Sequence, residues 1–133
     1  MPPANPEVAE AVRKAREVVD SALSGACGDS LCEAVRDLYA SFPRRGWLVR
    51  ATARLLMGTV RRSKVPWLWY VDGVRDFGDR QAVYLVELVS GEGYRCSCHK
   101  SLYGYRRRAR VCTHAAAVML YRRQLQVLDF LGG

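Results

Sequence analysis

Three cysteines and one histidine near the carboxyl end of the chain form the pattern with the clearest chemical meaning. One residue separates Cys96 from Cys98, one separates Cys112 from His114, and thirteen lie between the two pairs. Thiolate and imidazole suit tetrahedral zinc, and a set of three cysteines and one histidine closes the coordination shell. The spacing therefore predicts one structural zinc ion held by these four side chains.

The elements expected around the two pairs are able to bring them together. The segment 94–98 begins as a short strand, on which residues two apart point to the same side. Cys112 and His114 fall at the start of a helix expected over 113–131, and the partial positive charge at a helix N-terminus stabilises a thiolate. The alternative is that four unrelated reduced or buried side chains share this paired spacing by chance.

Two other interpretations of the metal site are weaker. His99 could replace His114 as a ligand, but directly after Cys98 it would form a strained chelate. A catalytic zinc ion keeps an open coordination position, whereas four good ligands are available here. The deaminase pattern of His-x-Glu with Pro-Cys-x-x-Cys is absent, and the only acid near the ligands is Glu92. We therefore expect a protein that is not an enzyme.

The rest of the chain predicts an α+β fold, in which N-terminal helices precede a small antiparallel sheet and the zinc-stapled C-terminal helix. Asn5 and Pro6 are typical of a helix start, and Gly25 breaks this helix. Ser30 and Glu33 have capping-box spacing and open a second helix that reaches about residue 41. A third short helix is expected over 47–57, and the expected strands cover 59–61, 66–71, 81–89 and the start of 94–98.

Charge divides the chain at the linker 43–46. Residues 1–43 carry four basic and seven acidic side chains, whereas residues 44–133 carry seventeen basic and six acidic ones, and the whole chain has a net charge of +8. We therefore predict an N-terminal helical segment over 1–43 and a zinc-binding domain over 44–133. A basic domain attracts polyanions, most commonly nucleic acid.

The segment between the two ligand pairs combines five cationic residues with two tyrosines. Arginine contacts phosphates and tyrosine stacks on exposed bases, so the segment favours nucleic-acid binding. The alternative is that the cations neutralise the metal site while the tyrosines cover the core. The nucleic-acid interpretation predicts contacts from Lys100, Tyr103, Tyr105, Arg106, Arg107, Arg108 and Arg110.

The Cys-x-Cys and Cys-x-His pairs, followed by an Ala-rich helix, resemble the SWIM zinc finger. His114 continues as His-x-x-Ala through Ala117, as is frequent in that family. The segments 53–60, 69–71 and 84–88 resemble the family's lead-in of a helix end and antiparallel strands. The resemblance covers roughly residues 50–122, and its specificity lies in the four ligands.

The resemblance implies a zinc-bound core that binds DNA or protein. Small stand-alone SWIM proteins most resemble the recombination-accessory group, which works with paralogues of the RecA-type recombinase. We therefore expect an accessory factor in recombination or repair that binds DNA. The alternative is an adaptor that docks a recombinase paralogue or another protein without touching nucleic acid.

The remaining cysteines and two of the tryptophans are expected to have structural rather than chemical roles, and the chain lacks long apolar runs. Cys27 and Cys32 are expected to be free buried thiols, with a disulfide as the alternative. Trp67 and Trp69 should lie on one strand face and pack in the core, and the segment 76–78 should form a hairpin turn. The chain has no apolar run of the length of about 18 residues that spans a bilayer, and no secretion signal, so we expect a cytoplasmic protein.

Overall fold

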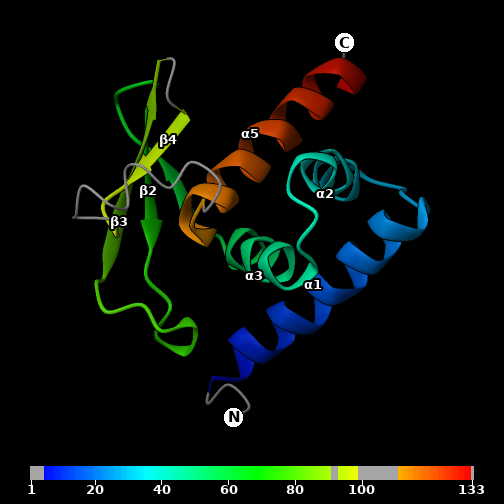
Figure 1. The fold of residues 1–133 in the computed structure, drawn as a ribbon, viewed down its shortest axis with the longest axis horizontal. Helices are drawn as coiled ribbons and strands as arrows, with labels where there is room; N and C mark the ends of the chain where they lie inside the picture. Colours follow the sequence, from blue (N-terminus) through cyan, green and yellow to red (C-terminus); the bar gives the residue numbers. More distant parts are fainter. Residues whose placement is uncertain (1–4, 91–92, 99–110, 133) are drawn as a thin grey trace.

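The computed structural model describes residues 5–90, 93–98 and 111–132, and it has the predicted α+β fold. In Figure 1 the sheet lies on one side of helix α5 and the remaining helices lie on the other. None of the described helices has the length and apolar character that crossing a membrane requires. The elements in chain order are α1 (Pro6–Ser24), α2 (Ser30–Ser41), α3 (Arg45–Leu56), β1 (Val60–Arg62), β2 (Leu68–Asp72), the 3-10 turn η1 (Arg75–Phe77), β3 (Val83–Val89), β4 (Gly93–Cys96) and α5 (Thr113–Gly132).

The first two helices begin at capping side chains. Asn5 caps α1, and its side chain accepts a hydrogen bond from the Glu7 N–H at 2.8 Å, as predicted. The predicted capping box of Ser30 and Glu33 is wrong. Asp29 caps α2 instead, because its carboxylate accepts from the Cys32 N–H at 2.8 Å and its carbonyl from the Glu33 N–H at 3.2 Å. The carboxylate also suits the positive end of the helix.

The sheet is an antiparallel meander in the order β1-β2-β3-β4. Trp69 of β2 lies opposite Val86 of β3, which lies opposite Cys96 of β4. All three side chains are buried, on the face that packs against the first half of α5. The register thus places Cys96, one of the predicted ligands, on the inner face beside that helix.

Helix α5 joins two apolar clusters. Ala116 and Leu120 pack with the buried faces of α1, α2 and α3, whereas Ala115, Ala117 and Val118 pack with the sheet. All five side chains are buried. The N-terminal helices therefore share a core with elements that follow residue 43, and the predicted division of the chain at that point stays a prediction.

The connection 73–82 between β2 and β3 folds back on itself. Gly73 donates its N–H to the Ala82 carbonyl at 2.8 Å, and a Cβ added at Gly73 would lie only 1.9 Å from the Gln81 carbonyl oxygen. Gly78 ends the turn η1 at φ 87°. The segment 76–78 is thus a hairpin connection, as expected, and its backbone needs glycine at both positions.

The prediction that Trp67 packs in the core is wrong. Its side chain is 54% exposed, whereas Trp69 is 5% exposed. The difference arises because β2 begins at Leu68, so Trp67 lies in the preceding connection rather than on the inner strand face.

The expectation of free thiols at Cys27 and Cys32 is also wrong. The two residues form a disulfide with a Cα–Cα distance of 5.3 Å. Cys27 lies in the connection before α2, and Cys32 lies on its first turn, where it is buried. The bond closes the α1–α2 connection onto the start of α2.

Replacing Cys27 by serine is expected to lower the free energy of unfolding by about 2 kcal/mol, because the unfolded chain regains the entropy of a short closed loop. Urea unfolding of the wild type and the variant measures this. Dithiothreitol should destabilise the wild type by the same amount and leave the variant unchanged. A wild-type midpoint that is identical in oxidising and reducing buffer would contradict the prediction.

Candidate metal centre

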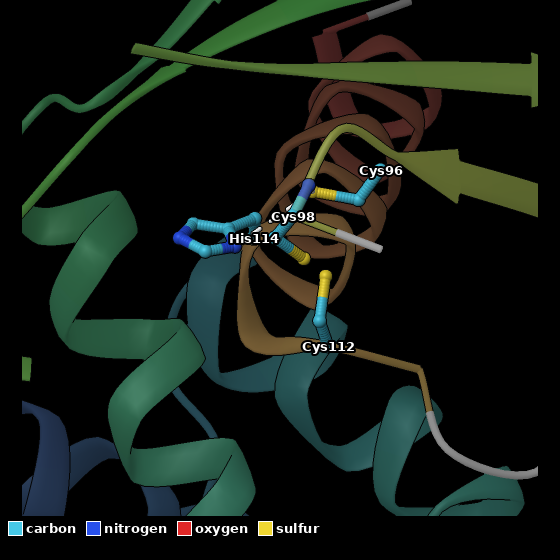
Figure 2. Close-up of side chains that lie close together, drawn as sticks. All are labelled: Cys96, Cys98, Cys112 and His114. Atoms are coloured by element: carbon cyan, nitrogen blue, oxygen red, sulfur yellow. Dashed lines mark hydrogen bonds between the residues drawn. The ribbon is translucent and has the colours of Figure 1, made fainter. Parts of the chain in front are cut away.

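The four predicted ligands converge on one point. The three sulfur atoms and a ring nitrogen of His114 all lie within 4.8 Å of one another, and Figure 2 shows their side chains directed toward a common centre. Cys96 ends β4, Cys98 lies in the following turn, and Cys112 and His114 stand at the start of α5. The fold thus assembles a group that could hold a metal ion from two elements that are separate in the sequence.

The separations suit a tetrahedral ion. Zinc–ligand bonds of about 2.3 Å to sulfur and 2.0 to 2.1 Å to nitrogen place a sulfur and a nitrogen ligand about 3.5 Å apart. Cys96 Sγ lies 3.7 Å from His114 Nδ1. Two sulfur ligands would be about 3.8 Å apart in the same geometry, so the 4.8 Å limit of the cluster requires only a small closure around an ion.

The cysteine pair 96–98 converges for a different reason from the one predicted. Strand β4 ends at Cys96, so Cys98 is not a strand residue. The chain turns instead, and the Cys98 N–H donates to Cys96 Sγ at 3.5 Å. Ser97 keeps the turn attached to β3, because its N–H donates to the Leu85 carbonyl at 2.9 Å. A backbone N–H directed at the sulfur stabilises the thiolate that a metal needs.

Cys112 acts as the cap of helix α5. Its carbonyl accepts from the Ala116 N–H at 2.9 Å, and its sulfur accepts from the Ala115 N–H at 3.4 Å. The preceding residue is fixed as well, since Trp47 Nε1 donates to the Val111 carbonyl at 2.6 Å. The helix terminus therefore presents partial positive charge to the Cys112 thiolate, as the sequence predicted.

Hydrogen bonds among the three cysteines give their thiol groups different pKa values. Bonds from Cys96 and Cys98 lower the pKa of Cys112 well below that of an ordinary thiol, against the opposing effect of burial. The bond to Cys112 raises the pKa of Cys98 to about 12, and the same partner together with burial raises the pKa of Cys96. These hydrogen bonds thus favour the thiolate form at Cys112, and a cation that binds all three sulfurs as thiolates would release protons.

A carboxylate orients the histidine. His114 Nε2 lies 3.0 Å from Asp79 Oδ1, and its ring stacks on Tyr84 with centroids 4.0 Å apart. A carboxylate only accepts, so Nε2 carries the proton and Nδ1 offers its lone pair to the cysteine side. A carboxylate behind a ligating histidine in this way fixes its tautomer and raises its basicity.

Asp79 is held by a buried arginine. Arg54 is 1% exposed and binds Asp79 through both terminal nitrogens, at 2.6 and 3.1 Å. Arg54 Nε also donates to Thr113 Oγ1 at 3.0 Å, and the Val74 N–H donates to Asp79 Oδ2 at 2.8 Å. Burial opposes ionisation of Asp79, but the Arg54 hydrogen bonds help to lower the net pKa. The candidate metal-binding group is therefore supported by a buried, charged network of hydrogen bonds.

Sequence reasoning missed Arg54, Asp79 and Tyr84. The sequence predicts only that Arg54 lies near the end of a helix and that Asp79 directly follows a hairpin turn. The single available signal is a charged residue, Arg54, within the otherwise mostly apolar residues 51–56 of a helix. That position predicts a buried cation in need of a partner, but it does not identify the partner.

The predicted nucleic-acid contacts lie outside the described residues. This applies to Lys100, Tyr103, Tyr105, Arg106, Arg107, Arg108 and Arg110, and to His99, the alternative ligand. The comparisons with known proteins add no family, because the chain matches no protein-family model, no curated protein and no solved structure.

Proposed function

We propose that Cys96, Cys98, Cys112 and His114 bind one structural zinc ion, and that the zinc-bound protein binds DNA. The convergence of the four ligand atoms within 4.8 Å carries the metal assignment. Three sulfurs and one nitrogen in tetrahedral reach select zinc over oxygen-seeking cations such as magnesium and calcium. Four protein ligands leave no open position for a substrate, which favours a structural rather than a catalytic ion.

The zinc ion would act as a staple. It would fix the end of β4 to the start of α5 and thereby bring together the two ends of the segment 99–110, which carries five cations. Tethering both ends reduces the entropy lost when such a segment binds a ligand. The excess of seventeen basic over six acidic residues after residue 43 provides the long-range attraction to phosphate.

The resemblance of the ligand spacing to SWIM zinc fingers supports the same assignment. It extends the proposal to an accessory role in recombination or repair. We propose that the protein acts in the cytoplasm. Binding, rather than catalysis, is the activity that we propose.

Salt-dependent DNA binding tests the proposal. The purified protein is expected to contain one zinc per chain and to bind a labelled oligonucleotide, with a logarithmic affinity that falls linearly as the logarithm of salt concentration rises. Replacing Arg106, Arg107 and Arg108 by glutamine should reduce that slope by about 2 on single-stranded DNA, at about 0.7 per lost phosphate contact. Fluorescence anisotropy over a salt series measures both quantities. Undetectable binding at low salt would contradict the DNA assignment.

A second candidate function is that of a protein adaptor, for instance for a recombinase paralogue. Its support is the end of α5, where Leu128 is 49% and Phe130 is 86% exposed. The apolar stripe of α1 and α2 offers no such surface, because it is buried against α3 and α5. A pull-down with and without nuclease distinguishes the two functions, since an adaptor keeps its partner after nucleic acid is digested.

A further inference from the structure

A groove lies between the β1–β2 hairpin and the second half of α5. Residues 62–66, 68 and 69 form one wall and residues 121, 122, 125 and 126 form the other, and the cavity has a volume of about 460 Å³. This volume falls in the range of about 300 to 1,000 Å³ that is usual for ligand sites. The groove is separate from the metal centre, because Arg122 lies eight residues after His114, which is about 12 Å along the helix.

The groove has an unbalanced positive charge. Arg62, Lys64 and Arg122 line it, and none of its described lining residues is acidic. Neither Arg62 nor Lys64 forms an ion pair with another residue in the described part of the chain. The neighbouring Arg61, by contrast, pairs with Asp72 at 2.7 Å on the same hairpin. The charges in the groove thus remain available to an anion.

Arg122 is fixed in place before any ligand binds. Its Nη1 donates to the Tyr94 hydroxyl, and its guanidinium lies 5.3 Å from the centroid of the Trp69 ring. Stacking and a hydrogen bond hold one face of the guanidinium, so little side-chain entropy remains to be lost on binding. This preorganised cation distinguishes the groove from a surface with scattered lysines.

Two other hollows differ from this groove in the charge of their lining residues. The hollow between α2 and α5 contains Glu33 and Asp37, which pair with Arg36 and Arg123 respectively. The hollow between α1 and α3 contains three arginines and Asp76. Each of these two hollows thus includes at least one carboxylate, whereas the described lining of the groove at β1–β2 includes none.

We infer that this groove binds the sugar–phosphate backbone of single-stranded nucleic acid. The inference rests on the proposed function and extends it, because it adds a second contact surface on described residues. Single strands are favoured over duplex because Trp67 is 54% exposed directly beside the lining residues Pro66 and Leu68, where its ring can stack on an unpaired base at the edge of the groove. Phosphates would contact Arg62, Lys64 and Arg122, and a base would stack on Trp67.

A pair of matched double variants tests the inference. Arg62→Gln with Lys64→Gln should reduce the salt slope for a fluorescein-labelled oligothymidylate of about 15 nucleotides by about 1.4, at about 0.7 per lost phosphate contact. Lys14→Gln with Arg16→Gln removes the same charge from the exposed face of α1 and should leave the slope unchanged. Trp67→Ala should weaken binding by about tenfold without changing the slope.

The outcomes separate this inference from the proposed function. If the wild type binds and the salt slope falls by the same amount in both double variants, binding depends only on net charge. That result would overturn the groove assignment but leave DNA binding intact. If polyglutamate displaces the oligonucleotide as effectively as unlabelled oligothymidylate, the groove selects acidic peptide instead, which also overturns the inference. If the wild type does not bind at all, the proposed function itself has failed.

Discussion

Replacing His114 or Cys98 by alanine is expected to abolish stoichiometric metal binding and to destabilise the sheet and helix α5 together. Metal binding to such a site contributes directly to folding, with apparent binding free energies of about 10 to 16 kcal/mol for structural zinc. The ligands come from β4, the following turn and the start of α5, so each loss removes a link between the sheet and the helix. Metal analysis by mass spectrometry and urea unfolding with and without chelator measure the two effects.

The disulfide cysteine provides the control for this experiment. Cys27→Ser also removes a sulfur atom, but from the α1–α2 connection, and it should leave the metal content at one per chain. A chelator should destabilise the wild type and the Cys27 variant strongly, and the His114 variant hardly at all. Full metal retention in both ligand variants would show that the cluster is not the metal site.

Replacing Arg54 by methionine is expected to lower the free energy of unfolding by about 3 to 5 kcal/mol, because it leaves the buried Asp79 carboxylate without its cation. Both side chains are almost fully buried, and the pair makes two hydrogen bonds. Arg61→Met is the matched control. It breaks an exposed ion pair with Asp72 and should cost less than about 1 kcal/mol. Equal losses in the two variants, measured by urea unfolding, would contradict a special role for the buried pair.

The same network predicts an effect on the metal centre. Asp79→Asn keeps the size of the side chain but weakens its hold on His114 Nε2, and metal affinity should fall by about 10- to 100-fold. A competition titration with a chromophoric chelator measures this affinity. If affinity is unchanged while stability falls, Asp79 supports the fold alone and does not position the ligand.

The group of four candidate ligands could be predicted from sequence because each pair is a local pattern. With one intervening residue, the Cα atoms of Cys96 and Cys98 stay close together in any backbone conformation. The expected strand geometry at Cys98 was wrong. The sulfur atoms of Cys96 and Cys98 still converge, because a tight turn also brings them to one side. The fold class followed from similarly local signals, such as Asn5 with Pro6 at the start of α1.

The surroundings of the site could not be predicted because they depend on long-range packing. Asp79 reaches His114 across thirty-five residues and Arg54 across twenty-five, through the connection that Gly73 allows to fold back. The disulfide was only the alternative to free thiols in the sequence analysis, for a related reason. Its geometry depends on where α2 begins, and the cap at Asp29 sets the direction of Cys32 toward Cys27.

The position of α5 between two cores restricts how this sequence can change. From Ala115 to Ala117 successive side chains contact the sheet and the helices in turn, and none is more than 2% exposed. A larger side chain at any of the three would push one layer away from the other, since packed interiors have little free volume. Homologous chains should therefore keep small residues in this stretch even where the exposed arginines and the end of α5 vary.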